Sequence, residues 1–393
     1  MDKRLVWLAV GSFAMSTVGF VFSSLLPAIA ADAGVSIPHA GYLITAFSLA
    51  YAIGAPVLSA LAGEIDRRRV LAAAMVSFVA GNIIAATSSS FFGLLAAQIL
   101  MGMSAGLFAA TAQATAVALA GPEHRARAIA VVVGGTTFAV ALGAPAGSLI
   151  ATMWGWRGTF VAIALLGVAC AAILWARLPH GMRGARLTLG ERFAAIGRPG
   201  ILPSLAVTFL YLTGGFAIIS YVAPLTTEGA GLPALAIPGM LLAFGVGAVV
   251  GNLASGYLAD RIGATRVVVL ALLTSAAVSV VIALVLKFLP PAISGPALIA
   301  LMGLWGTIGW SFPPAQASRI VGFAPEVAHL TLSLNASALY FGIAAGTVVG
   351  GRVLEFATPS DLGLVAAVFP MLALAVLMAS SRSRRVAAAP AAE

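Results

Sequence analysis

Eleven uninterrupted stretches of at least 19 residues contain no Asp, Glu, Lys, Arg or His. A helix needs about 20 apolar residues to cross a bilayer, and it must satisfy its own backbone hydrogen bonds because lipid offers no partners. Hydrophobic residues make up 61% of the chain and charged residues 8%, which leaves too few polar groups to cover a soluble globule of this size. The chain is therefore predicted to be an all-α integral membrane protein.

The longest stretch, residues 70–122, predicts two helices rather than one. A polar turn cluster that includes Ser88 and Gly93 interrupts it, so eleven stretches predict twelve transmembrane helices. The longest charged hydrophilic segment, 177–200, lies near the midpoint and is predicted to be a cytoplasmic linker. It separates two predicted six-helix halves, 1–176 and 201–381, and residues 382–393 form a tail.

Basic residues set the orientation, because short cytoplasmic loops retain Lys and Arg. With the N-terminus in the cytoplasm, twelve spans place 18 of the 21 basic residues on that side, and only Arg157, Lys287 and Arg352 fall outside. The net charge of +9 is therefore read as a topology signal and not as a nucleic-acid surface. We expect a multi-pass protein of the cell (inner) membrane with both termini in the cytoplasm.

The two halves carry traces of an internal repeat. Shifted by 197 positions, segment 54–70 aligns without gaps on segment 251–267, and both segments close an even-numbered span and begin the next cytoplasmic turn. Transporters are often built from two such halves, with the cargo site at mid-depth between them.

Several motifs resemble the major facilitator superfamily, and in particular its twelve-span drug:proton antiporters of the arabinose and chloramphenicol efflux type. They are the cytoplasmic loop signature 256–266, the antiporter motif 143–147 (Gly-Ala-Pro-Ala-Gly), the following 155–157 (Gly-Trp-Arg), 221–224 (Tyr-Val-Ala-Pro) and 333–337 (Ser-Leu-Asn-Ala-Ser). The resemblance implies a secondary active transporter that exports small amphipathic or sugar-like molecules by alternating access, in exchange for protons. The alternative is an uncoupled facilitator of a small solute.

Gating residues are expected in the loop signatures and in the bent fifth span. An acid in a cytoplasmic loop can bind a helix N-terminus or an arginine when that side is closed. Proline and glycine in a span favour bending and close helix contact. The candidates are Asp66, Arg67, Gly143, Pro145, Gly147, Asp260 and Arg261.

Two positions differ from the proton-coupling pattern of these antiporters. Gly19 and Gln98 stand where these antiporters often carry an acid in span one and an arginine in span four. All 12 acidic residues fall in predicted loops, tails or last turns, whereas proton relays usually lie within the membrane. Asp32 is the proton-coupling candidate, and its alternative role is a solvated stop signal.

Cargo candidates are the polar and aromatic side chains inside predicted spans, for which helix packing is the alternative role. Tryptophan usually marks the membrane interface, but Trp305 and Trp310 lie near the middle of span ten. The remaining candidates are Gln98, Gln113, Tyr211, Phe216, Tyr221 and Asn335.

Other functions lack the residues that they need. The chain has no phosphate-binding loop, no catalytic pair or metal-ligand set at membrane depth, and a single cysteine, Cys170. We expect no enzyme activity, no cofactor or metal, and no nucleic-acid partner. The expected partners are a small-molecule substrate, the lipid bilayer and protons, and the expected state is a monomer.

Overall fold

The computed structural model describes residues 2–120, 124–183, 190 and 194–388. The first half contains α1 (Arg4–Ala33), α2 (Ile37–Leu61), α3 (Arg67–Thr87), α4 (Phe91–Ala120), α5 (Arg125–Phe138), the π-helical turn η2 (Ala139–Gly143) and α6 (Ala144–Arg177). After the 3-10 turn η3 (Ala195–Gly197), the second half contains α8 (Ile201–Ile219), α9 (Val222–Pro224), η4 (Leu225–Gly229), η5 (Ala234–Ala236), α10 (Ile237–Ile262), α11 (Ala264–Phe288), α12 (Pro291–Val321), η6 (Pro325–Val327), α13 (Ala328–Phe356), η7 (Pro359–Asp361) and α14 (Leu362–Ala388). The described residues contain no strand, which confirms the all-α prediction.

Among the residues that the structure describes, eleven helical segments are long and apolar enough to span a membrane. One of them, Arg127–Arg177, has 51 residues and would be about 75 Å long if straight, more than twice the lipid core. It breaks at Gly155, whose φ of 76° is accessible mainly to glycine. Beyond this break, Arg157 donates to the carbonyl of Ser88 at one end of the bundle, and Leu178 accepts from Arg68 at the other end. The segment therefore crosses twice, and the described part of the chain forms twelve spans.

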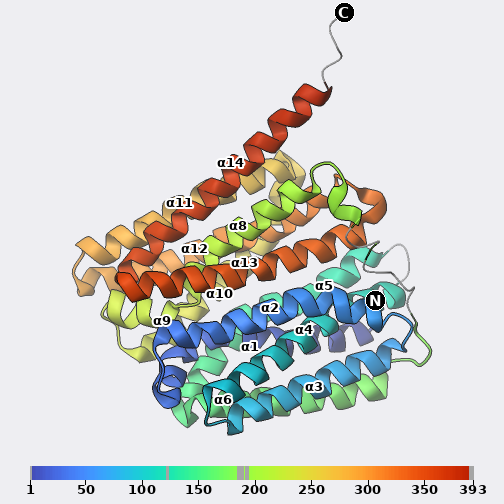
Figure 1. Cartoon of the computed structure of the whole chain (residues 1–393), viewed down its shortest axis with the longest axis horizontal. Coiled ribbons are helices and arrows are strands. Elements are labelled where there is room, and N and C mark those ends of the chain that lie inside the picture. The colour runs from blue at the N-terminus through green and yellow to red at the C-terminus, as the bar shows by residue number, and fades with distance from the viewer. Residues whose placement is uncertain (1, 121–123, 184–189, 191–193, 389–393) are drawn as a thin grey trace, which may run out of the picture.

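The helices gather in two bundles. Figure 1 shows α1 to α6 together on one side of the molecule and α8 to α14 together on the other. Within the first bundle α2 packs against α4, and α3 against α4 and α6, while in the second α10 packs against α12, and α8 against α13 and α14. The residue limits set for the two halves stay a prediction.

Glycines bring α10 and α12 into backbone contact. A Cβ built on Gly247 would lie 2.0 Å from the carbonyl oxygen of Gly303, and one built on Gly251 would lie 1.9 Å from that of Thr307. From the other side, a Cβ on Gly306 would lie 2.2 Å from the carbonyl oxygen of Phe244. Membrane helices gain their packing energy through such small residues, because lipid supplies no hydrophobic drive between helices.

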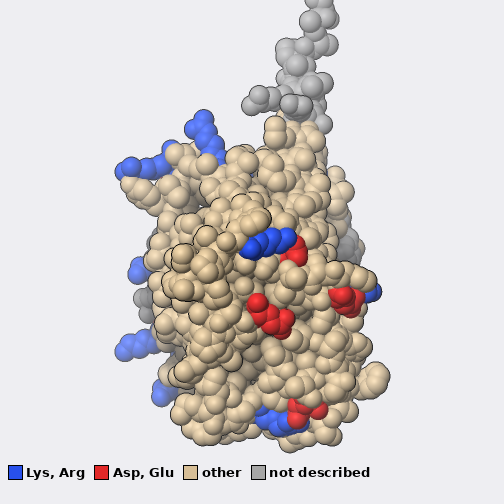
Figure 2. All heavy atoms as spheres, turned by 90° about the vertical axis from the view of Figure 1, so that its left-hand side faces the viewer, with Lys and Arg blue, Asp and Glu red and all other residues tan. Residues whose placement is uncertain are grey.

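The two ends of the bundle differ in charge. We call the end at which α1 and α3 begin the basic end, and the end at which α9 lies the far end. The three basic residues that the orientation count places outside all lie at the far end, and each is paired with a carboxylate. The pairs are Arg157 with Asp32 (2.7 Å), Lys287 with Asp361 (2.5 Å) and Arg352 with Glu355 (2.6 Å). Figure 2 views this end and shows basic groups beside acidic ones, together with an acidic group that has no basic neighbour in this view.

Candidate functional site

The surface along which the two bundles meet, here called the seam, lies between α1, α2 and η2 on one side and α8, α10, α12 and α13 on the other. At mid-depth Ser337 donates to the carbonyl of Ala52 (2.9 Å), and Asn252 donates to Thr137 (2.9 Å). Nearer the far end, a Cβ built on Gly245 of α10 would lie 2.4 Å from the Cα of Ala141 in η2. The seam is thus packed from the far end down to mid-depth.

Tyr221 closes the far end of the seam. Its side chain is fully buried, and its hydroxyl donates to the backbone carbonyl of Thr347 (2.8 Å). A Cβ built on Gly41 of the other bundle would lie 2.2 Å from this hydroxyl, and one built on Gly351 would lie 2.7 Å from it. We call these four residues the far-end latch, because a tyrosine from one bundle fills a space that glycine leaves in the other.

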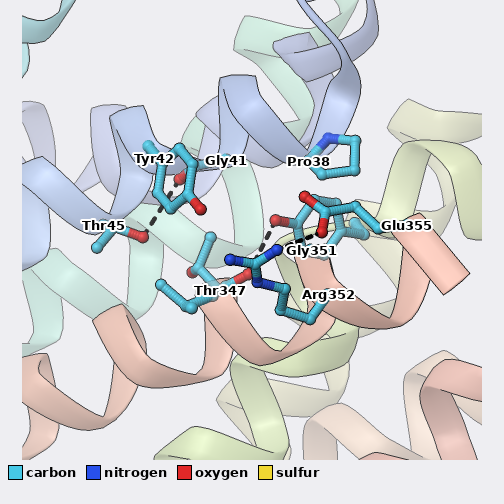
Figure 3. A pocket seen from close by; sticks show the side chains of 10 residues that line it. Pro38, Gly41, Tyr42, Thr45, Thr347, Gly351, Arg352 and Glu355 are labelled. Carbon is cyan, nitrogen blue, oxygen red and sulfur yellow. Dashed lines mark hydrogen bonds and ion pairs between the residues drawn. The ribbon is translucent and has the colours of Figure 1, made fainter.

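A small pocket lies beside the far-end latch. Figure 3 shows Pro38, Tyr42 and Thr45 of α2 facing Arg352 and Glu355 of α13 across it. The guanidinium of Arg352 points toward the carboxylate of Glu355, with which it is paired. The charged groups that line this pocket are therefore engaged with each other.

Three aromatic rings meet near the middle of the seam. Phe20 of α1 lies 6.2 Å from Phe216 of α8 and 6.1 Å from Trp310 of α12, measured between ring centroids. The interplanar angles are 44° and 49°, so neither partner covers the face of the Phe20 ring. All three side chains are half-buried. The structure thus brings two of the cargo candidates, Phe216 and Trp310, together in what we call the central aromatic cluster.

A second aromatic contact crosses the seam between α2 and α13. Tyr51 and Tyr340 stack with their ring centroids 3.5 Å apart and their planes inclined by 16°. In contrast to the central aromatic cluster, each ring here covers the face of the other. The pair lies close to the hydrogen bond from Ser337 and packs the seam at this depth.

Asn335 belongs to a polar network inside the second bundle. Its side-chain oxygen accepts from the hydroxyl of Thr208 (2.7 Å), and Gln316 donates to the carbonyl of Ser204 (2.8 Å) and to Thr208 (3.2 Å). Arg319, which is only 7% exposed, donates to the amide oxygen of Gln316 (3.3 Å). Because a charge inside a membrane protein needs partners, this network accommodates an arginine that the orientation count treats as a loop residue.

The other cargo candidates lie apart from the central aromatic cluster. Gln98 is 2% exposed in the far-end half of α4, while Gln113 is half-buried toward the basic end of the same helix. Tyr211 stacks on Phe312 within the second bundle, with ring centroids 3.9 Å apart. Trp305 packs against Phe244, and its indole nitrogen is buried without a hydrogen-bond partner among the described residues.

Asp66 and Arg67 join the first bundle to the start of the linker. The carboxylate of Asp66 accepts from the backbone N–H of Gly181 (2.9 Å) and, as the N-cap of α3, from that of Arg68 (3.0 Å). The backbone N–H of Arg67 donates to the carbonyl of Met182 (2.8 Å), and its side chain donates to that of Ala114 (2.8 Å). These hydrogen bonds hold the pKa of Asp66 below its ordinary value of 3.8, and the bond from Gly181 has the largest effect.

Replacing Asp66 with alanine is expected to destabilise the protein at neutral pH, by about 1 kcal/mol for the lost helix cap. Because the folded state lowers the pKa of Asp66, its contribution is complete above the ordinary value of 3.8 and is lost as the pH falls through the lowered value. The difference in Tm between wild type and Asp66→Ala should therefore be present at neutral pH and shrink in acid. Asp66→Asn, which keeps a capping oxygen, is the control, and a difference that grows in acid would contradict the assignment.

Gly143, Pro145 and Gly147 lie where the helix winding changes. The π-helical turn η2 ends at Gly143, directly before the helix that contains Pro145, and a proline lacks the N–H of a regular helical bond. A Cβ on Gly143 would lie 2.3 Å from the Thr17 hydroxyl oxygen, and one on Gly147 would lie 2.7 Å from Val21. The motif therefore holds the fifth span tightly against α1 beside a change of winding.

The remaining gating and coupling candidates lie at the two ends of the molecule. Asp260 and Arg261 are exposed at the basic end. The guanidinium of Arg261 lies 4.4 Å from the ring centroid of Tyr257 in its own helix. Asp260 makes no hydrogen bond or ion pair with another described residue. Asp32 is paired with Arg157 at the surface of the far end. No group of three or more His, Cys, Asp or Glu in the described part of the chain could hold a metal.

Sequence reasoning missed several residues of the seam. Phe20 and Gly41 carry no local signal, since each lies within an apolar run and gains its role from a residue of the other half. Tyr51 and Tyr340 do carry one, because they lie in the middle of their spans and not at the interface where tyrosine is usual.

Two six-helix bundles with a packed seam and an aromatic centre define a transporter of the major facilitator type. The chain belongs to this family: the model for the Major Facilitator Superfamily matches residues 8–347. The family prediction is thereby confirmed, and the chain is a membrane transporter and not an enzyme.

Relatives and solved structures agree with this assignment. The chain is 32% identical to the inner membrane transport protein YdhP of Escherichia coli (strain K12) over 98% of its own length and 97% of the relative. It is also 32% identical to a chloramphenicol resistance protein of Streptomyces lividans, over 96% of each chain. A crystal structure of a D-xylose-proton symporter superposes with a TM-score of 0.77 at 15% identity, covering 93% of this chain and 96% of that one, which shows the same fold.

Proposed function

We propose that this protein exports small amphipathic or sugar-like molecules across the cell (inner) membrane by alternating access. The observation that carries the proposal is the seam: its contacts run from the far end to mid-depth and end at the central aromatic cluster. A carrier needs a cargo site between two halves that can separate at either end in turn. The name of the chloramphenicol resistance relative supports export of a small amphipathic compound.

We propose that the far end faces the outside of the cell and that both termini lie in the cytoplasm. The three basic residues on the far end are neutralised by ion pairs, whereas Arg69, Arg261 and Arg266 are exposed at the basic end. This distribution follows the rule that cytoplasmic loops retain positive charge. We propose that the protein works as a monomer in the bilayer, with the cargo and protons as its partners.

Exchange for protons is the coupling that the antiporter branch suggests, with Asp32 as its candidate. A facilitator without ion coupling is the second candidate, favoured by the position of the acids. Three of the 12 acidic residues, Glu123, Glu191 and Glu393, lie outside the described residues. The others lie in connections or within the last turn of a helix, and Asp32 itself is held by Arg157. Coupling through an acid at mid-depth therefore has no support among the described residues.

Reconstituted vesicles test both candidates. Purified protein in proteoliposomes is offered chloramphenicol and a panel of sugars, with and without an imposed pH gradient, and uptake is followed over time. Accumulation driven by the gradient and abolished by a protonophore is expected for antiport. Equilibration that ignores the gradient supports the facilitator, and uptake no faster than in protein-free vesicles would overturn the transport proposal for these compounds.

Asp260→Asn is expected to slow transport while leaving membrane insertion and thermal stability unchanged. In this structure the carboxylate has no partner among the described residues, so its removal changes little here. Contacts with a helix N-terminus or an arginine, formed when the basic end closes, are worth about 0.3 to 2 kcal/mol, or roughly 2- to 30-fold in the balance of the two states. Turnover is measured in vesicles of matched protein content, and wild-type turnover would remove the gating role.

A further inference from the structure

We propose that the central aromatic cluster and the adjacent face of α12 form the cargo site, and that the site selects uncharged, planar aromatic molecules that carry a hydrogen-bond acceptor. The inference rests on the proposed transport function and adds the chemical class of the cargo.

Two glycines next to the cluster leave room for a ligand. A Cβ built on Gly309, the neighbour of Trp310, would meet no atom within 4 Å, and the same holds for Gly215, the neighbour of Phe216. Both glycines are only half-buried. A helix turns about 100° per residue, so Gly309 faces about 140° away from Leu304, an exposed residue on the outer side of α12. The unfilled space next to Gly309 is therefore on the inner side of α12.

A hydrogen-bond donor without a partner lies one turn away. Trp305 precedes Gly309 by four residues and so shares its face of α12. The side chain is 4% exposed, and its indole N–H has no partner among the described residues. Buried donors are nearly always satisfied, so an orphan N–H on this face of α12 indicates an acceptor on a bound molecule.

The arrangement of the rings favours a planar ligand. Because the rings of Phe216 and Trp310 are tilted by 44° and 49° to that of Phe20, the Phe20 ring does not cover their faces, whereas Tyr51 and Tyr340 cover each other. An inserted aromatic ring can stack on such faces.

The charge distribution argues against ions. The described carboxylates lie at helix ends or in connections, and the buried arginines Arg68 and Arg319 lie in the end turns of α3 and α12. A charged cargo at the cluster would lose its hydration without a described counter-charge. Attraction of a cation to the ring faces is the one opposing effect, and it requires a direct test.

Equilibrium binding to the full-length protein in lipid nanodiscs provides that test. The probes are naphthylmethanol, methylnaphthalene, which lacks the acceptor, and naphthylmethyl-trimethylammonium, which adds a positive charge to the same ring, with empty nanodiscs as the blank. We expect naphthylmethanol to bind most tightly and the cation to bind at least tenfold more weakly. Equal or tighter binding of the cation would overturn the charge selectivity.

Variants locate the site. Gly309→Leu fills the room and should weaken naphthylmethanol binding at least tenfold, whereas Gly239→Leu, the same change at an exposed glycine with no atom within 4 Å, should not. Trp305→Phe keeps a ring but loses the N–H, so it should weaken naphthylmethanol about fivefold and leave methylnaphthalene unchanged. Wild-type affinity in Gly309→Leu, or an equal loss for both probes in Trp305→Phe, contradicts the assignment.

The vesicle assay keeps the two proposals apart. Binding with the expected selectivity but without transport would overturn the proposed function and leave the site. Transport that persists at wild-type affinity in both Gly309→Leu and Gly215→Leu would overturn the site and leave the function.

Discussion

Gly41→Leu is expected to reduce transport to the background of protein-free vesicles while both bundles remain folded. Any side chain at this position would occupy the place of the Tyr221 hydroxyl, since a Cβ there would lie 2.2 Å from it and 3.4 Å from Thr347. The clash lies between the bundles and not within either, so it affects the closed far end and not the fold. Overpacking costs about 1 to 3 kcal/mol, which shifts the balance of the two states by roughly 5- to 150-fold.

Cysteine labelling reports the expected opening directly. In a background that lacks Cys170, a cysteine placed at Thr45, beside the far-end pocket, should react with a maleimide faster in Gly41→Leu than in the parent. Gly239→Leu, at an exposed position of the same end, is the matched control. Unchanged labelling together with wild-type transport would show that the far-end latch does not control opening.

Gly251→Val is expected to disrupt the second bundle itself. The new Cβ would lie 1.9 Å from the carbonyl oxygen of Thr307, a backbone atom that cannot move unless α12 shifts as a whole. We expect a loss of about 3 kcal/mol, at the upper end of the usual cost of overpacking. For a unit of this size that lowers the Tm by roughly 6 to 12 °C.

The same helix supplies the control for this prediction. Gly256 lies five residues further along α10, is exposed, and a Cβ there would meet no atom within 4 Å. Gly256→Val should therefore leave the Tm nearly unchanged. Both variants are compared by size-exclusion chromatography and thermal unfolding in one detergent, and equal Tm values would show that α10 and α12 can separate at little cost.

Much of the fold is predictable from the sequence because each span is a local property. The polar residues around Ser88 mark the turn between α3 and α4, and the positions of charges separate most other spans. The break at Gly155 lies in a 51-residue apolar helix, where Arg157 is the only charge that marks it. Hydropathy and charge are sufficient here because lipid requires an apolar stretch of about 20 residues in every spanning helix.

The site is less predictable because it arises between elements far apart in the chain. Tyr221, proposed from sequence as a cargo residue, lies buried in the far-end latch, a place determined by Gly41 and Gly351. Trp310 meets Phe20 across the seam, and no periodicity of either helix records that contact. The side chain of Arg68 is only 8% exposed, and its guanidinium lies over the ring of Trp175. Its position at a span end predicts a solvated charge instead.

The paired charges of the far end affect how solutes approach that face. Opposite charges 2.5 to 2.7 Å apart act at a distance as dipoles, whose potential decays faster than that of single ions. Salt at physiological strength screens what remains beyond about 8 Å. These pairs therefore steer solutes only at short range, where fit and not long-range attraction decides the approach.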